Sequence, residues 1–150
     1  MFVERPSDAI CELASEVGVW LMAGVEGNGA ALEAELSRLA RYAAVFMAVL
    51  PTGTPVARSM RHAAPNLLLA ERPATDGKMA GSLASPPHAD CVVLDATDPE
   101  TFAVAARGTR IPIIAQRRPA DPQNVVGARR ASDALQRDLA SLGDYAGYIA

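Results

Sequence analysis

Apolar residues near the start of the chain recur at the spacing of a helix. They lie on one face of residues 8–17, with Ser7 placed to cap the helix and Asp8 in its first turn. The apolar positions are Ile10, Leu13, Ala14 and Val17. The same spacing continues through Leu21, so a single helix over residues 8–23 is the alternative.

A short apolar run follows between Gly18 and Gly24, and its length predicts a buried strand with Trp20 in the core. Three glycines in residues 24–29 then predict a turn. Leucines at helical spacing predict a second helix of about four turns over residues 32–43. We therefore expect a strand, a glycine turn and a helix in succession.

Further strands and helices are predicted to alternate along the rest of the chain. The strand candidates are residues 44–50, 66–70, 91–95, 111–115 and 145–149. The helix candidates are residues 56–64, 98–107 and 125–142, and the first of these has Thr54 as its N-cap and Pro55 at position N1. Pro112 suggests an edge position or the beginning of a strand for its segment. Helical spacing through residue 50 leaves a helical hairpin over residues 8–50 open.

This alternation predicts an α/β fold. We expect one domain over residues 1–150, with three layers and a mostly parallel sheet of five or six strands flanked by helices, as in P-loop NTPase-like and Rossmann-like folds.

Composition and charge narrow the possible classes of function. The chain has 150 residues, of which 50% are hydrophobic and 21% charged, and a net charge of −3. We expect neither nucleic acid as a partner nor direct insertion into a membrane, because there is no general basic field and no apolar run long enough to span a bilayer. Residues 1–10 do not resemble a signal peptide, and two distant cysteines, Cys11 and Cys91, do not make a disulfide framework. These features predict a cytoplasmic protein.

The glycine turn has the outer spacing of a phosphate-binding loop. In the Walker A pattern G-x-x-x-x-G-K-[ST], the lysine neutralises phosphate charge and the hydroxyl binds magnesium. This chain has Gly24 and Gly29 at the two glycine positions, with Gly27 and Asn28 inside the loop. Ala30 and Ala31 stand in place of the lysine and the hydroxyl residue, and Glu26 adds a negative charge. The pattern predicts a phosphate loop without its chemistry, or a simple turn.

The strand over residues 91–95 ends in Asp95, where a P-loop enzyme holds magnesium through water. On its own, an aspartate at the end of a strand is more often a helix cap or a hydrogen-bond anchor. An aspartyl phosphotransfer site is not favoured, because Thr97 breaks the D-x-D pattern of haloacid dehalogenases and the acidic pair and lysine of receiver domains are missing. Lys78, the only lysine, is expected at the surface of a loop.

The order of these motifs resembles the MinD/ParA group of P-loop ATPases, and most closely the cytoplasmic domain of bacterial tyrosine kinases of polysaccharide export. The G-E-G-K-S-T loop of that family corresponds to residues 27–32, and its D-x-D strand to residues 45–51, which contain no acid. Its D-Y-V-I-I-D-T-P-P strand is similar to residues 90–99, its R-x-G-x-T turn to 111–121, and its last helix and strand to 128–149.

The resemblance implies a family scaffold that keeps only Asp95 among the catalytic positions. It therefore implies a pseudo-ATPase with no catalytic residue, no cofactor and no bound metal. The tyrosine-rich tail of the kinases is missing, because Tyr145 and Tyr148 fall in a predicted strand.

Arginines make the last third of the chain locally basic. Arg117, Arg118, Arg129 and Arg130 are the candidates for docking an acidic partner, and a solvated surface is the simpler interpretation. His62 and His88 have no acid or second histidine at the spacing of a metal site.

Two hypotheses follow. The first is a protein-binding subunit or regulator, a homo- or hetero-oligomer, which by the resemblance belongs to an exopolysaccharide or cellulose biosynthesis or secretion assembly. The second is a small α/β phosphotransferase or nucleotide-dependent enzyme that uses Asp95.

Overall fold

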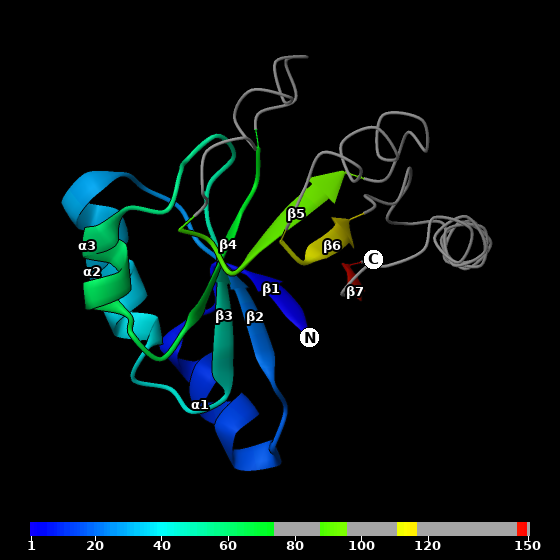
Figure 1. Ribbon diagram of the computed structural model, residues 1–150. Helices are drawn as coiled ribbons and strands as arrows, with labels where there is room; N and C mark the ends of the chain where they lie inside the picture. The colour runs from blue at the N-terminus through cyan, green and yellow to red at the C-terminus, as the bar shows by residue number, and fades with distance from the viewer. Residues whose placement is uncertain (74–87, 96–110, 117–146, 150) are drawn as a thin grey trace, which may run out of the picture.

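The structure is a computed structural model that describes residues 1–73, 88–95, 111–116 and 147–149 (Figure 1). Strands and helices alternate along the first half of the chain. In chain order the elements are β1 (Phe2–Glu4), α1 (Asp8–Val17), β2 (Leu21–Gly24), α2 (Gly29–Leu39), β3 (Val45–Val49), α3 (Arg58–Ala63), β4 (Leu68–Glu71), β5 (Cys91–Asp95), β6 (Ile113–Gln116) and β7 (Gly147–Ile149).

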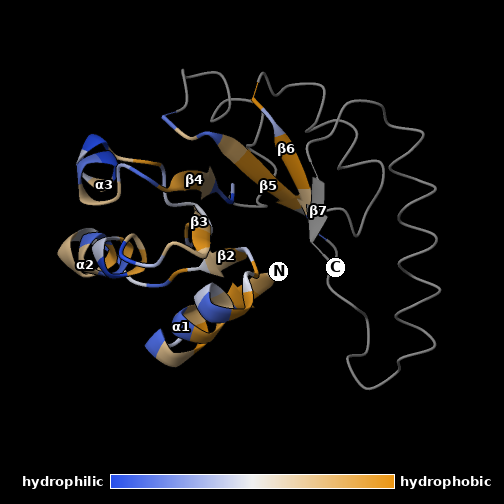
Figure 2. Cartoon of the chain, turned by 90° about the horizontal axis from the view of Figure 1, so that it is seen from below, coloured by the Kyte–Doolittle hydropathy of each residue, from blue (hydrophilic) through white to orange (hydrophobic). Residues whose placement is uncertain are grey.

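All seven strands form one parallel sheet, and their order in space is their order in the sequence, β1-β2-β3-β4-β5-β6-β7. The sheet curls along its length, so that β5, β6 and β7 turn away from the plane of β2 and β3 (Figures 1 and 2). The predicted α/β class, a parallel sheet flanked by helices, is confirmed. The arrangement is consistent with a three-layer Rossmann-like fold, with one strand more than the expected five or six.

The three helices that the structure describes lie along one side of β2, β3 and β4 (Figure 2). Right-handed connections between neighbouring parallel strands in sequential order pass over the same face of a sheet, which accounts for this placement. The apolar layer between these helices and the sheet is fully buried at its centre, where α2 contributes Leu32, Leu36 and Leu39 and the sheet contributes Leu21 and Leu69.

The other face of the sheet, on the inside of the curl, is also apolar. Met47 and Val49 of β3 lie beside Val93 of β5 and Ile114 of β6, and Phe2 of β1 packs against this cluster. A strand buried on both faces reads as a continuous apolar run, because alternate side chains serve different layers. This explains why residues 44–50 contain no polar side chain.

The boundary between α1 and β2 lies where the sequence predicts it. Ser7 caps α1 by accepting a hydrogen bond from the Ile10 N–H, and Gly18 ends the helix with a left-handed backbone at φ +71°. The alternative of one helix over residues 8–23 is therefore wrong. The helical hairpin over residues 8–50 is wrong as well, because that segment contains β2 and β3.

Some predicted boundaries shift by a few residues. The second helix ends at Leu39 rather than at residue 43, because Ala40 to Ala44 form the turn into β3. The helix α3 begins at Arg58 with Ala57 as its N-cap, not at the predicted Thr54 cap. Pro112 lies directly before β6, and its carbonyl oxygen accepts a hydrogen bond from the Val92 N–H.

The prediction missed β1, which has only three residues. The strand over residues 91–95 agrees with β5 at both ends, and the final predicted strand contains β7. The predicted helices over residues 98–107 and 125–142 lie outside the described residues, as does Lys78. No helix in the described part of the chain combines the length and the apolar character that crossing a bilayer requires.

Candidate functional site

The glycine loop connects β2 to α2, as the sequence predicts. The strand ends at Gly24 and the helix begins at Gly29, and both Gly27 and Gly29 have positive φ angles, +106° and +48°. The Val25 N–H donates to the carbonyl oxygen of Val49 at 3.0 Å, which holds the start of the loop on β3. The backbone thus makes the sharp turn that a phosphate loop or a simple connection would need.

The exposed part of this loop has no basic side chain that would neutralise the charge of a phosphate. Residues 26–31 are exposed, Ala30 and Ala31 occupy the first turn of α2, and Asn28 makes no capping hydrogen bond with its side chain. The acid in the loop, Glu26, forms an exposed ion pair with Arg5 at 3.2 Å. The amide end of α2 therefore faces outward beside a carboxylate rather than beside a lysine.

Asp95 lies at the carboxyl end of β5, in register with Gln116 of β6. Both β3 and β4 separate this strand from β2, so the sheet order puts three strand spacings, about 14 Å, between Gly24 and Asp95. A P-loop enzyme needs its strand-terminal acid close enough to share one magnesium ion with the bound phosphates. The glycine loop and Asp95 thus lie at the same, carboxyl edge of the sheet with two strands between them.

A polar cluster that the sequence analysis missed lies at the carboxyl ends of β1 and β4. The guanidinium of Arg72, directly after β4, donates from Nη2 to Oε1 of Glu4 at 3.0 Å. Its central carbon lies 5.4 Å from the centre of the Phe2 ring, within the range of a cation–π contact. The Arg72 side chain is 14% exposed and that of Glu4 is 53% exposed. Arg72 is thus the buried partner of the pair.

A repeated tripeptide is the signal that could have found this cluster. Glu-Arg-Pro occurs at residues 4–6 and again at residues 71–73, each time where a strand of the sheet ends. A similar ending, Gln-Arg-Arg-Pro, begins at Gln116, and only that residue of the motif lies in the described part. In parallel α/β sheets the carboxyl ends of the strands are where ligands bind, so charged residues that recur there point to a site.

A second ionic cluster lies at the opposite, amino end of β5. Asp90 Oδ2 accepts hydrogen bonds from Arg61 Nη1 and from the Leu69 N–H, both at 2.7 Å. Burial works to raise the pKa of Asp90, but these two donors outweigh it and hold the pKa below its ordinary value of 3.8. Arg61 also donates to the carbonyl oxygen of His88, so the cluster ties α3 to the start of β5.

The cysteines and histidines do not form a metal site in the part of the chain that the structure describes. Cys11 and Cys91 are both buried and unlinked, on opposite faces of the sheet. Burial raises the pKa of the Cys11 thiol and raises that of Cys91 to about 11. Such thiols are inert packing residues rather than nucleophiles.

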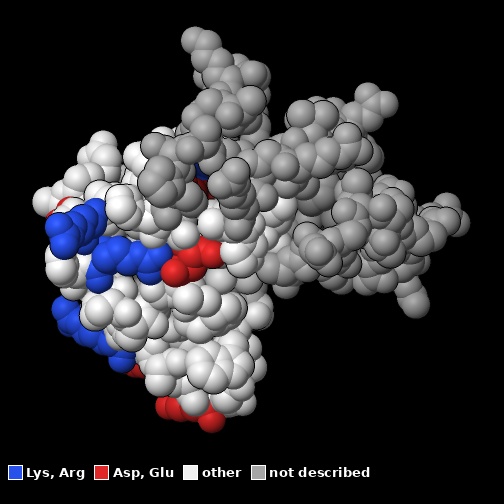
Figure 3. All heavy atoms as spheres, in the orientation of Figure 1, with Lys and Arg blue, Asp and Glu red and all other residues white. Residues whose placement is uncertain are grey.

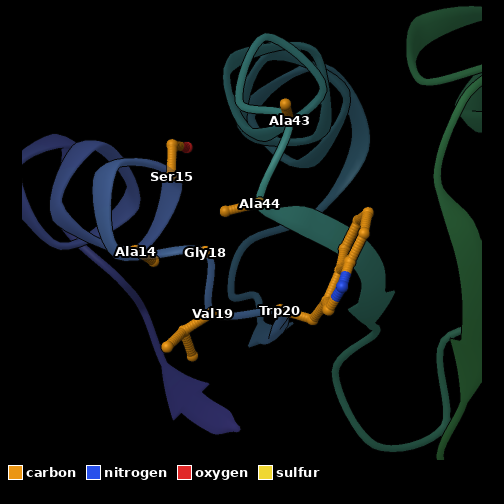
Figure 4. A pocket seen from close by; sticks show the side chains of 7 residues that line it. All are labelled: Ala14, Ser15, Gly18, Val19, Trp20, Ala43 and Ala44. Atoms are coloured by element: carbon orange, nitrogen blue, oxygen red, sulfur yellow. The ribbon is translucent and has the colours of Figure 1, made fainter.

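Trp20 is not in the core, contrary to the prediction. It precedes β2 and is 64% exposed, because the strand begins one residue later and the indole ring lies edge-on against Phe46, with centroids 6.3 Å apart. A pocket of about 200 Å³ lies beside it, between the end of α1, residues 18–20 and residues 43–44 (Figure 4). The Trp20 side chain reaches away from Gly18 and Val19 and forms one wall of this pocket.

Exposed apolar side chains continue from this pocket onto α1. We call this set the α1 surface, and it comprises Ile10, Leu13, Val17, Val19 and Trp20, with exposed fractions between 38% and 64%. The first three lie on one helical face because they are three and four residues apart. An exposed group of large apolar residues on a small domain is a feature of binding surfaces.

Charged side chains on the described part of the molecule are of mixed sign. Basic side chains gather over α2 and α3, with acidic ones directly beside them (Figure 3). The partner-binding arginines that the sequence suggested, Arg117, Arg118, Arg129 and Arg130, lie outside the described residues.

No protein-family model, curated protein or solved structure matches this chain in comparisons with known proteins.

Proposed function

We propose that this chain is a protein-binding subunit with a degenerate P-loop-like α/β scaffold, and that it does not hydrolyse nucleotides. One feature supports the absence of hydrolysis: the glycine loop has Ala30 and Ala31 where phosphate and magnesium would be held. The observation that carries the binding role is the α1 surface with its adjoining pocket.

The charges on α1 indicate the kind of partner. Glu12 and Glu16 are exposed and four residues apart, so they form an acidic ridge along the helix, whereas Asp8 at the same spacing is paired with Arg38. This ridge runs beside the apolar face that contains Leu13 and Val17. A partner segment that complements both is an amphipathic helix with an apolar face and basic flanks.

Fluorescence of Trp20 tests this role directly, because it is the only tryptophan in the chain and belongs to the α1 surface. The probe is a synthetic amphipathic helix of leucine and lysine, with a leucine and glutamate helix as the matched control. We expect a saturable blue shift with the basic peptide and none with the acidic one. Equal responses to both peptides, or no response, would contradict the proposal.

Two substitutions locate the binding. Leu13→Ser removes an apolar contact from the α1 surface and should weaken binding of the basic peptide. Leu68→Ser is the matched control, since Leu68 is also an exposed leucine, at 44%, but lies at the start of β4. Equal effects of the two substitutions would place the binding elsewhere.

Nucleotide binding is tested by calorimetric titration with ATP and magnesium. The wild-type chain should give no binding heat. A second candidate function, a small phosphotransferase or nucleotide-dependent enzyme, is favoured by one observation: Asp95 lies at the same edge of the sheet as Glu4 and Arg72. Micromolar ATP binding that is lost in Asp95→Asn would support this second function and contradict the first.

The pathway rests on the family resemblance alone. A role in exopolysaccharide or cellulose biosynthesis or secretion predicts that deleting the gene from its native cell lowers the amount of exported polysaccharide. Normal export in the deletion strain would remove this part of the proposal and leave the binding role to the peptide titration.

A further inference from the structure

The pair formed by Arg72 and Glu4 is built across the sheet rather than along it. Glu4 ends β1 and Arg72 follows β4, with β2 and β3 between these strands. The two residues are 68 positions apart in the sequence, and their side chains meet over the carboxyl end of β2. A contact of this kind requires room above the strand that it crosses.

Gly24 supplies that room. A Cβ atom built on Gly24 would overlap Oε2 of Glu4, so the carboxylate lies where any other residue would place its side chain. The end of β1 is strained as well, because Arg5 has a positive φ angle of +50° while its N–H donates to the Gly24 carbonyl oxygen at 2.8 Å. Strain of this type persists where the surrounding structure enforces it, and it concentrates at functional sites.

The guanidinium of Arg72 has more donors than its partners use. Its Nε is buried and has no hydrogen-bond partner among the residues that the structure describes, while Nη2 binds a single oxygen of Glu4. A buried donor without a partner is costly, and in native proteins it usually has an explanation such as a bound water or ion. Nε and Nη2 together form the edge of a guanidinium that binds carboxylate or phosphate with two hydrogen bonds.

The backbone holds Arg72 in place. Its carbonyl oxygen accepts a hydrogen bond from the Gly53 N–H at 2.6 Å, and the neighbouring Glu71 accepts one from the Val56 N–H at 2.5 Å. Phe2 lies against the guanidinium. Arg72 is therefore fixed and mostly buried, whereas Glu4 is half exposed and is the partner that is able to turn toward solvent.

We propose that Arg72 is an anion-binding residue that takes the oxyanion of a small phosphate- or carboxylate-bearing molecule, with Glu4 as the counter-ion that this ligand replaces. With the site empty, Glu4 balances a charge that would be costly to bury alone. On binding, two ligand oxygens occupy Nε and Nη2, and the Glu4 carboxylate moves into water. Neither the α1 surface nor nucleotide hydrolysis enters this proposal.

The test measures binding of inorganic phosphate and of malonate to the full chain, with chloride at equal ionic strength as the reference. The readout is the NMR resonance of the Arg72 Nε–H group, assigned by its loss in Arg72→Gln. We expect a saturable shift with at least one of the two anions, and the one that binds more tightly identifies the ligand class. A resonance that responds no differently from chloride overturns the proposal.

Substitution of the counter-ion separates a binding site from a structural ion pair. Glu4→Gln removes the competing carboxylate and should strengthen anion binding by on the order of tenfold. Arg72→Lys loses the planar fork and should weaken it, and Arg41→Gln, at an exposed arginine of the same chain, is the control that should change nothing. If Glu4→Gln and Arg72→Lys leave anion affinity equal to that of wild type, the pair is structural only.

Protein binding by the α1 surface and anion binding by Arg72 can be contradicted independently of each other. Trp20 and the pocket beside the α1 surface lie at the amino end of β2, and Arg72 lies at the carboxyl end of β4. Loss of anion binding in Arg72→Gln with an unchanged Trp20 response to the basic peptide would leave the protein-binding role intact.

Discussion

Asp90 shows how a single side chain joins two parts of this fold. Its carboxylate accepts from the Leu69 N–H at the start of β4 and from Arg61 of α3, so it orders the region where the chain enters β5. A carboxylate that accepts a charged donor and a backbone donor at once contributes more than a neutral hydrogen bond.

We predict that Asp90→Asn lowers the free energy of unfolding by about 1.5 kcal/mol. The amide oxygen of asparagine still accepts from Leu69, but the attraction to Arg61 is lost. Urea unfolding of Asp90→Asn, Arg61→Gln and the double variant measures the coupling between them. Strictly additive effects of the two substitutions would show that the ion pair contributes nothing.

Residue identity alone did not predict which side chains are buried. Trp20 was expected in the core because it belongs to an apolar run, but the strand begins after it and leaves the ring at the surface. The sequence predicts Gly24 as part of a turn, whereas in the structure its lack of a Cβ makes room for Glu4, which comes from another strand. The exposure of Trp20 and the role of Gly24 both depend on neighbours that are distant in the sequence.

At the scale of elements, local chemistry determined the boundaries well wherever a cap or breaker was present. Ser7 and Gly18 delimit α1, and Gly24 and Gly29 delimit the connection from β2 to α2. The prediction was weaker where no such residue stands, as at the end of α2, where Ala40 is the cap. It missed β1 because three residues carry no periodic signal and pairing with β2 alone defines them.

The end of α1 offers a clean test of such a breaker. We predict that Gly18→Ala lowers the free energy of unfolding by about 1 kcal/mol, because φ is +71° there and an L-residue is strained in that region. A Cβ at Gly18 has nothing within 4 Å, so no steric clash adds to the cost. Gly18→Asn is the matched variant and should cost less, since asparagine tolerates this conformation. Equal losses for both in thermal unfolding would contradict this account.

At the scale of the whole molecule, the fold class followed from the alternation of apolar strands and helices, but the order of the strands did not. Each connection from one strand to the next is long enough for the next strand to take any of several positions in a parallel sheet. The hydrophobic pattern alone therefore does not determine the order of the strands. The sequential order places two strands between the glycine loop and Asp95, and the contact between Glu4 and Arg72 also crosses two strands. The candidate site therefore had to be found from the structure.

The response of the whole fold to acid depends on carboxylates that form ion pairs with arginines. Asp8 and Glu35 both bind Arg38, which also donates to the Pro6 carbonyl oxygen and so joins α1 to α2. The hydrogen bond from Arg38 holds the pKa of each carboxyl below its ordinary value, 3.8 for Asp8 and 4.5 for Glu35. Asp90, beside Arg61, behaves in the same way.

A pKa that is lower in the folded state contributes stability that is complete above the unfolded value and is lost as the pH falls through the folded value. We therefore predict that the free energy of unfolding, measured by urea titration between pH 6 and pH 2.5, declines below about pH 4.5. Arg38→Met with Arg61→Met removes the cations that lower all three pKa values, so the double variant should be less stable at pH 6 and should lose less on acidification. Parallel curves for the two proteins would mean that these carboxylates do not link the helices to the sheet in the way their contacts indicate.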